Sequence, residues 1–224
     1  MGRTKEQLEL DRRWSQRKHR GGRRPGPNPR IRHRSREGVS RRLPCHVTLK
    51  VRDGVPSLRS VRLVQELERS FASCCERGDF RLVHYSLQGN HAHLIVEADD
   101  RQSLGRGMKA LGARLARAVN RVFGRVGPVL ADRYHVRALN TPREVRNALA
   151  YVLLNARRHA ARAGRTLSRV IRIDPASSGC WFDGWRGATS SPREGTAVST
   201  PRTWLLSVGW RQWGLLDPLE PPGR

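Results

Sequence analysis

Residues 80–97 read FRLVHYSLQGNHAHLIVE and predict a β-hairpin. In its first half Val83, Tyr85 and Leu87 recur at every second position, so we expect them to share one face of a strand. The glycine of the segment at 88–90 marks a short turn, after which the alternation resumes. Two strands joined by so short a turn pair antiparallel, and the rest of the predicted fold is arranged around this hairpin.

The second strand of the hairpin carries two histidines. Because side chains alternate along a strand, His91 and His93 share one face, and the other face takes the apolar residues Ala92, Leu94 and Val96. We expect the apolar set to pack on helices and the imidazoles to lie side by side on the open face. There they could bind one divalent ion. By itself, a His-x-His pair fits a polar open face at least as well.

Periodic segments on both sides of the hairpin complete the predicted fold. The order is strand, helix, strand, strand, helix, strand, helix. The first six elements match the split β-α-β arrangement, a ferredoxin-like α+β fold with a four-stranded antiparallel sheet and two helices on one face. The last helix, opened by Thr141 and Pro142, is free to cross near the open face. Outside the hairpin we expect strands at 46–51 and 129–139 and helices at 57–77, 103–123 and 141–163.

The charge of the chain indicates a polyanionic partner. It has 44 Lys and Arg against 19 Asp and Glu, a net charge of +25, and all but four of the basic residues are arginine. Such a balance is most often found in nucleic-acid-binding proteins. We find no apolar run long enough to span a membrane and no secretory signal, and expect a cytoplasmic, nucleoid-associated protein. Four cysteines without a Cys-x-x-Cys pair exclude a disulfide scaffold and a zinc knuckle.

Composition divides the chain into three parts. We expect a disordered basic arm at 1–42, a catalytic domain at 43–164 and a Trp-rich extension at 165–224. The extension holds five of the six tryptophans. They either anchor it on the core, or one or two of them stack on unpaired bases.

The last predicted helix carries a second candidate site. Tyr151 and Asn155 are four residues apart, which places them on one face of a helix. A phenolate can attack a phosphodiester and form a covalent phosphotyrosine, a reaction assisted by a divalent metal. The alternative is an interfacial tyrosine with a bonded hydroxyl and a surface asparagine.

Together, the two motifs resemble those of the HUH single-tyrosine transposases, in the branch of small insertion sequences and REP-associated tyrosine transposases. His91-Ala92-His93 lies on the predicted third strand. The final predicted helix carries the second motif, Tyr151-Val-Leu-Leu-Asn155. The stretch at 120–134, NRVFGRVGPVLADRY, also resembles that branch. The resemblance covers about residues 44–162. Ala92 departs from the family, which usually has a bulky apolar residue between the histidines.

The resemblance implies a specific chemistry. His91 and His93 would be metal ligands for Mg²⁺ or Mn²⁺, Asn155 the polar third ligand and Tyr151 the nucleophile. The family cleaves single-stranded DNA that contains hairpins, leaves a 5′-phosphotyrosine and a free 3′-OH, and rejoins strands by the reverse attack. Many members are homodimers and some are monomers.

Other residues are assigned more coarsely. We expect four arginines to contact the DNA phosphates: Arg114, Arg117, Arg121 and Arg133. The first three recur at helical spacing in the predicted helix at 103–123. The remaining histidines of the core and final helix have no partner spacing and are interpreted as structural or surface residues: His46, His84, His135 and His159.

Two alternatives stay open. One is a non-catalytic, single-stranded nucleic-acid-binding protein with an RRM-like sheet, although this sheet would offer histidines in place of stacking aromatic residues. The other is a domesticated family member without mobility.

Overall fold

The computed structural model describes residues 39–162, 164, 173–187 and 195–219, all of them in the unit formed by residues 36–224. Most of the predicted basic arm, residues 1–38, lies outside the described residues. No helix within the described residues is long and apolar enough to cross a membrane.

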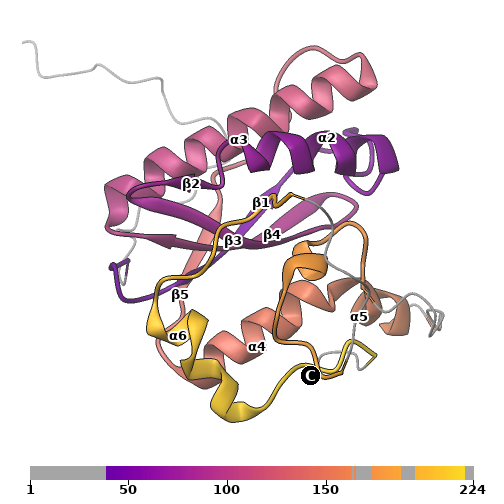
Figure 1. The fold of residues 1–224 in the computed structure, drawn as a ribbon. Coiled ribbons are helices and arrows are strands. Elements are labelled where there is room, and N and C mark those ends of the chain that lie inside the picture. The colour runs from indigo at the N-terminus through magenta and orange to yellow at the C-terminus, as the bar shows by residue number, and fades with distance from the viewer. Residues whose placement is uncertain (1–38, 163, 165–172, 188–194, 220–224) are drawn as a thin grey trace, which may run out of the picture. The chain divides into compact units, whose positions relative to one another are not determined.

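An antiparallel sheet lies between two helical layers (Figure 1). The predicted four strands are present and pair in the order β3-β4-β1-β5, with the two-residue β2 beyond β3. This is the strand order of a ferredoxin-like sheet, so the predicted α+β class is confirmed and β2 is an unpredicted addition. The bounds are β1 Cys45–Lys50, β2 Glu76–Arg77, β3 Phe80–Leu87, β4 His91–Ala98 and β5 His135–Ala138.

Strand β3 departs from the predicted alternation at Val83. Its pairing with β4 shifts register between Leu82 and His84. Val83 therefore packs in the apolar cluster with α4, whereas Tyr85 and Leu87 pack in the cluster with α2 and α3. The prediction that these three share a face is wrong, because a β-bulge inserts one residue and inverts the alternation beyond it.

Two helices, α2 (Val61–Ala72) and α3 (Arg101–Phe123), cover one face of the sheet (Figure 1). The first begins later than predicted, since Ser60 is its N-cap and accepts a hydrogen bond from the Leu63 amide. The second ends at Gly124, whose φ of 61° is the left-handed geometry of a helix C-terminus. The apolar set of β4, which we expected to face helices, lies in this core.

The opposite face is covered by α4 (Pro142–Leu153), followed by α5 (Asn155–Arg162). Thr141 caps α4 as expected and accepts from the Glu144 amide. The single predicted helix to 163 is wrong, because Leu154 leaves helical geometry with φ −104° and ψ 13°. Residues 152–155 are all buried, which the one apolar stripe of a straight helix cannot achieve. The interruption lets the chain bury all four.

The described part of the Trp-rich extension packs on α4 and β3. It contains η1 (Ser178–Trp181), α6 (Trp204–Ser207) and η2 (Gly209–Trp213). Trp185 and Trp210 are buried in the cluster beneath α4, whereas Trp204 and Trp213 are 61% and 50% exposed. The extension is therefore anchored by two of its tryptophans, and two others face solvent.

Candidate active site

The face of the sheet beneath α4 is rich in histidine. Residues directly opposite each other on paired strands share a face, so β1 and β4 place His46 and Thr48 on the same face as His93. The register with β5 adds His135 to this face, opposite Thr48. The alternation predicted for His91 and His93 thus holds.

The two histidines of β4 form a pair. The Nε2 atoms of His91 and His93 are 3.1 Å apart, and the ring centroids are 4.7 Å apart. Nδ1 of His91 lies 2.8 Å from Asn90 Oδ1. Because a carbonyl oxygen only accepts hydrogen bonds, Nδ1 carries the proton and Nε2 keeps its lone pair.

His93 is held from its other side. Its Nδ1 lies 3.2 Å from both His46 Nε2 and Thr48 Oγ1. Nδ1–H of His93 can donate to either of these two atoms. Nε2 of His93, which faces His91, then keeps its lone pair. A metal-binding histidine usually has such a partner on its second nitrogen, which fixes tautomer and ring orientation.

The environment keeps these imidazoles neutral. Burial lowers the pKa of His93 to about 3, and the neighbouring histidines add to the effect. Burial, followed by Arg137, lowers the pKa of His46 to about 4. Burial also lowers the pKa of His91, together with His159 and Lys50. Neutral imidazoles are the form that binds a metal ion.

Tyr151 lies against this group of histidines. Its ring centroid is 4.9 Å from that of His93 and 5.7 Å from that of His46, in both cases edge-on. The guanidinium of Arg158 lies 5.0 Å from the same ring centroid. The half-buried tyrosine of α4 is thus in contact with both the histidines and a cation.

Asn155 is a buried amide without a partner. It is 1% exposed, and neither Oδ1 nor Nδ2 has a hydrogen-bond partner within the described residues. It is the first residue of α5, between Tyr151 and His159, whose ring is 6.4 Å from that of His91. An orphaned buried amide costs about 1–3 kcal/mol, which points to a missing ligand.

The spacing of the two Nε2 atoms fits two ligands of one divalent ion. Adjacent ligands of an octahedral ion with bonds of about 2.1 Å are about 3.0 Å apart, close to the Nε2–Nε2 distance of 3.1 Å. Among the described residues, no group of three or more His, Cys, Asp or Glu side chains is arranged to hold a metal. The third donor would then be the Asn155 amide oxygen.

The sequence interpretation missed two members of this cluster. His46 and His159 were assigned structural or surface roles, yet His46 contacts His93 and His159 lies near His91. For each of the two histidines, the sequence contains a pattern that could have predicted its place in the cluster. Alternation on β1 places His46 on the polar face, and His159 follows Asn155 by four residues.

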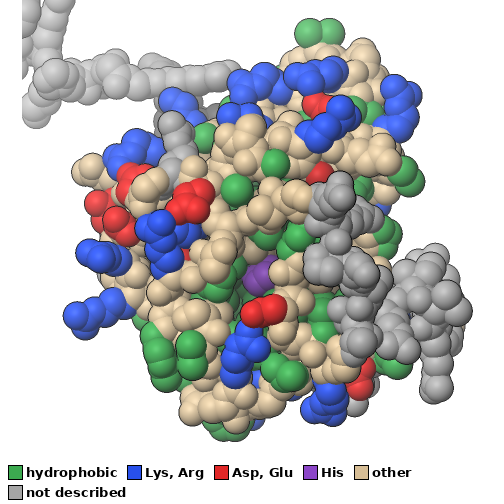
Figure 2. All heavy atoms as spheres, in the orientation of Figure 1, with side chains coloured by type: hydrophobic (Ala, Val, Ile, Leu, Met, Phe, Trp, Pro, Cys, Tyr) green, Lys and Arg blue, Asp and Glu red, His purple; other side chains and the backbone are tan. Residues whose placement is uncertain are grey.

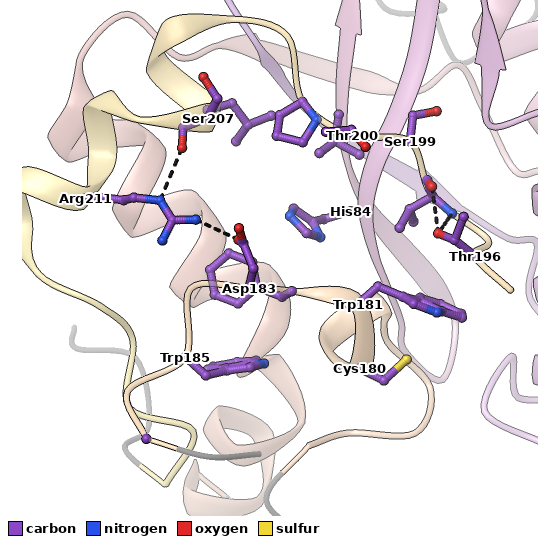
Figure 3. A pocket seen from close by; sticks show the side chains of 16 residues that line it. His84, Cys180, Trp181, Asp183, Trp185, Thr196, Ser199, Thr200, Ser207 and Arg211 are labelled. Carbon is purple, nitrogen blue, oxygen red and sulfur yellow. Dashed lines mark hydrogen bonds and ion pairs between the residues drawn. The ribbon is translucent and has the colours of Figure 1, made fainter. Parts of the chain in front are cut away.

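His84, in contrast, is a buried histidine beneath the extension. Its Nδ1 lies 3.2 Å from Ser178 Oγ, and burial lowers its pKa to about 4. Its ring points into a pocket at whose edge Arg211 pairs with Asp183 at 2.7 Å (Figure 3). This agrees with the structural role expected for it.

The structure does not bring the three predicted arginines of α3 to the histidines. Arg114, Arg117 and Arg121 lie on α3, across the sheet from Tyr151. Arg114 donates to Ser73 Oγ at 2.8 Å and Arg121 pairs with Glu66 at 2.5 Å. Arg133 is an exposed residue just before β5. Basic side chains gather over α2 and α3 in Figure 2, so phosphate contacts by the three arginines of α3 would be made on that layer.

Comparisons with known proteins find similar solved structures and one matching family model. No protein of curated function matches the chain significantly. Similar solved structures include a REP-associated tyrosine transposase bound to a REP hairpin, with 16% identity and a TM-score of 0.42 over 57% of this chain and 74% of that one. Another is a protein from Deinococcus radiodurans R1 named as a candidate transposase, with 17% identity and a TM-score of 0.38 over 49% and 87%.

The family model described as "Transposase IS200 like" matches residues 41–152, which is half of the chain. The matched range contains the histidine pair and Tyr151. The chain therefore belongs to the IS200-like transposase family.

Proposed function

We propose that the protein is a metal-dependent endonuclease and strand transferase that cleaves single-stranded, hairpin-containing DNA through a 5′-phosphotyrosine intermediate. The proposal rests on membership of the transposase family and on one observation above the others. The paired Nε2 atoms of His91 and His93 lie beside the ring of Tyr151.

Tyr151 is the proposed nucleophile. A bond forms between its phenolic oxygen and the scissile phosphorus, and the bond from phosphorus to the 3′ oxygen breaks. The phenol loses one proton and the leaving 3′ oxygen gains one. The reverse attack by a 3′-OH on the phosphotyrosine rejoins two strands.

His91, His93 and Asn155 would hold Mg²⁺ or Mn²⁺. Bound there, the ion would polarise the scissile phosphate as a Lewis acid. His46 and Thr48 offer the Nδ1 proton of His93 the acceptors that would hold His93 in the required tautomer, and Arg158 supplies a positive charge beside Tyr151.

Covalent trapping tests the nucleophile. A hairpin labelled on the 3′ side of its cleavage site is incubated with the full chain and Mn²⁺, then analysed on a denaturing gel. We expect a labelled protein–DNA adduct that Tyr151→Phe abolishes and that chelation of the metal prevents. Tyr134→Phe, at a tyrosine outside this cluster, is the matched control and should retain the adduct. An adduct that survives Tyr151→Phe overturns the assignment.

Loss of the metal site should separate cleavage from binding. His91→Ala is expected to abolish the adduct while retaining most of the salt-sensitive affinity, because arginines supply most of that affinity. The exposed residues Arg117 and Arg133 are proposed to contribute. Charge reversal at Arg117 should reduce the salt dependence of binding without changing the adduct yield of bound DNA.

A purely nucleic-acid-binding role has less support. The face of β1 and β4 beneath α4 presents His46, Thr48 and the buried His93, and not the solvent-exposed aromatic surface on which bases stack. A domesticated member would keep the same chemistry, and the presence of both histidines, Tyr151 and Asn155 argues for retained chemistry. The proposed setting is DNA in the cytoplasm, with the protein acting as a monomer or a homodimer.

A further inference from the structure

Trp204 is a large apolar side chain held in a fixed position at the surface. It is the first residue of α6 and is 61% exposed. One side of its ring packs against the backbone of Gly209, where a Cβ atom would come within 2.7 Å of Cζ3. The glycine thus supports one face of the indole while much of the ring stays open to solvent.

Arginines surround this indole. Trp204 lines a groove of about 790 Å³ together with Arg41, Arg42 and Arg202. Arg202 pairs with Glu76 at 2.7 Å. Arg41 and Arg42 are exposed and make no ion pair or hydrogen bond with other described residues. Two uncompensated guanidinium groups next to an open aromatic face are the features of a single-strand contact site.

The groove is fixed to the same sheet as the active site. Glu97, 3% exposed at the end of β4, accepts hydrogen bonds from the backbone amides of Arg202 and Thr203 at 2.8–3.1 Å. Glu97 follows His93 by four residues on the same face of the strand. Four residues of extended chain span about 13 Å, so Glu97, which holds the backbone of Arg202 and Thr203, lies about that far along β4 from His93.

We propose that Trp204 is the base-stacking platform of a second single-stranded DNA contact, whose phosphates are bound by Arg41, Arg42 and Arg202. An unpaired base stacks on the free indole face, which a base inside a duplex cannot do. The proposal extends the substrate assignment made above, from the reacting phosphate to the unpaired flank of the hairpin.

The test measures binding alone. Full-length protein carrying Tyr151→Phe is titrated, without divalent metal, against a labelled hairpin with a single-stranded flank and against the same hairpin with blunt ends. Trp204→Ala should weaken binding of the flanked hairpin by about tenfold and leave the blunt hairpin unchanged. Trp204→Phe, which keeps an aromatic ring, should restore most of the affinity.

Trp213 provides a matched control. It is also half exposed, and Arg143 lies 5.4 Å from its ring centroid, so Trp213→Ala removes a similar area outside the groove. We expect less than a twofold effect from it. Charge reversal of Arg41 and Arg42 together should lower the slope of log affinity against log salt by about two.

Two results would overturn the proposal. One is equal affinity for Trp204→Ala and Trp213→Ala on the flanked hairpin. The other is a loss in Trp204→Ala that is the same for flanked and blunt hairpins. Because no cleavage is measured, failure of the phosphotyrosine chemistry in the native protein would leave this result intact. Conversely, an ineffective Trp204→Ala would not affect the adduct assay.

Discussion

The Nε2 atom of His46 lies 3.2 Å from the Nδ1 atom of His93, on the side of the His93 ring that faces away from His91. These two residues are 47 positions apart and are brought together by the pairing of β1 with β4. The contact gives the Nδ1 proton of His93 an acceptor when His46 Nε2 is unprotonated. In that tautomer Nε2 of His93 keeps its lone pair for a ligand.

Removing this contact should weaken metal binding. We expect His46→Ala to reduce the affinity for Mn²⁺ by about 10–100-fold, measured by titration calorimetry on the DNA-free protein. Since Thr48 Oγ1 lies at the same distance from Nδ1, the double variant with Thr48→Val should lose more. His46→Gln, which keeps an acceptor, should recover part of the affinity. His135→Ala, at an exposed histidine of β5, is the control, and wild-type affinity in His46→Ala would contradict the assignment.

Asn155 should show opposite effects on function and stability. Asn155→Leu removes an amide that is buried without partners, so the free energy of unfolding should rise, by about 1 kcal/mol after the cost of the larger side chain. The same variant should lose affinity for Mn²⁺, because it lacks the proposed third oxygen ligand. Thermal unfolding and calorimetry are the two measurements. Destabilisation with unchanged metal affinity would show that the amide is structural.

Two glycines of α3 should respond oppositely to alanine. At Gly107 a Cβ would lie 2.2 Å from the Phe80 ring, so the helix approaches β3 closely only because no side chain intervenes. Gly107→Ala should cost about 1–3 kcal/mol of unfolding free energy. At Gly105 no heavy atom lies within 4 Å of the added Cβ, and alanine there should stabilise the helix by about 0.5–1 kcal/mol. Denaturant unfolding of both variants measures the difference, and a similar sign for both would be inconsistent with the packing.

Stability should fall in mild acid through His84. Its folded pKa of about 4 lies below the ordinary value of 6.5, because burial disfavours the charged form more than Asp183 favours it. The unfolded chain therefore binds a proton first, and stability that is full above pH 6.5 is lost as the pH falls toward 4. Over that pH range, one such group lowers the free energy of unfolding by about 3 kcal/mol.

The matched variants isolate this effect. His84→Gln should retain a hydrogen bond to Ser178. It should also reduce the slope of the unfolding free energy against pH by the equivalent of one bound proton. His135→Gln removes an exposed imidazole and should keep the slope of the native protein. An unchanged slope in His84→Gln would mean that another group carries the acid sensitivity.

Local patterns predicted most of the elements, because alternation and helical periodicity are properties of neighbouring residues. The end of α3 at Gly124 lies where it was predicted, whereas α2 begins after Ser60 and not at residue 57, since the start of a helix depends on which of several candidate residues caps it. The bulge at Val83 was not predictable in this way. The bulge depends on the register between β3 and β4. That register is set by the contacts of both strands with the apolar clusters on the two faces of the sheet.

The candidate site shows the same division. By itself, the sequence determined that His91 and His93 share a face, that Tyr151 lies on a helix, and that the chain is strongly basic. Only the tertiary structure decided that His46 and His159 join them, that Leu154 interrupts the helix so that Asn155 is buried, and that Trp204 stays exposed while Trp210 does not. The physical reason is that strand pairing and helix docking join residues far apart in the chain, and the free energy of those contacts is not encoded in any local period.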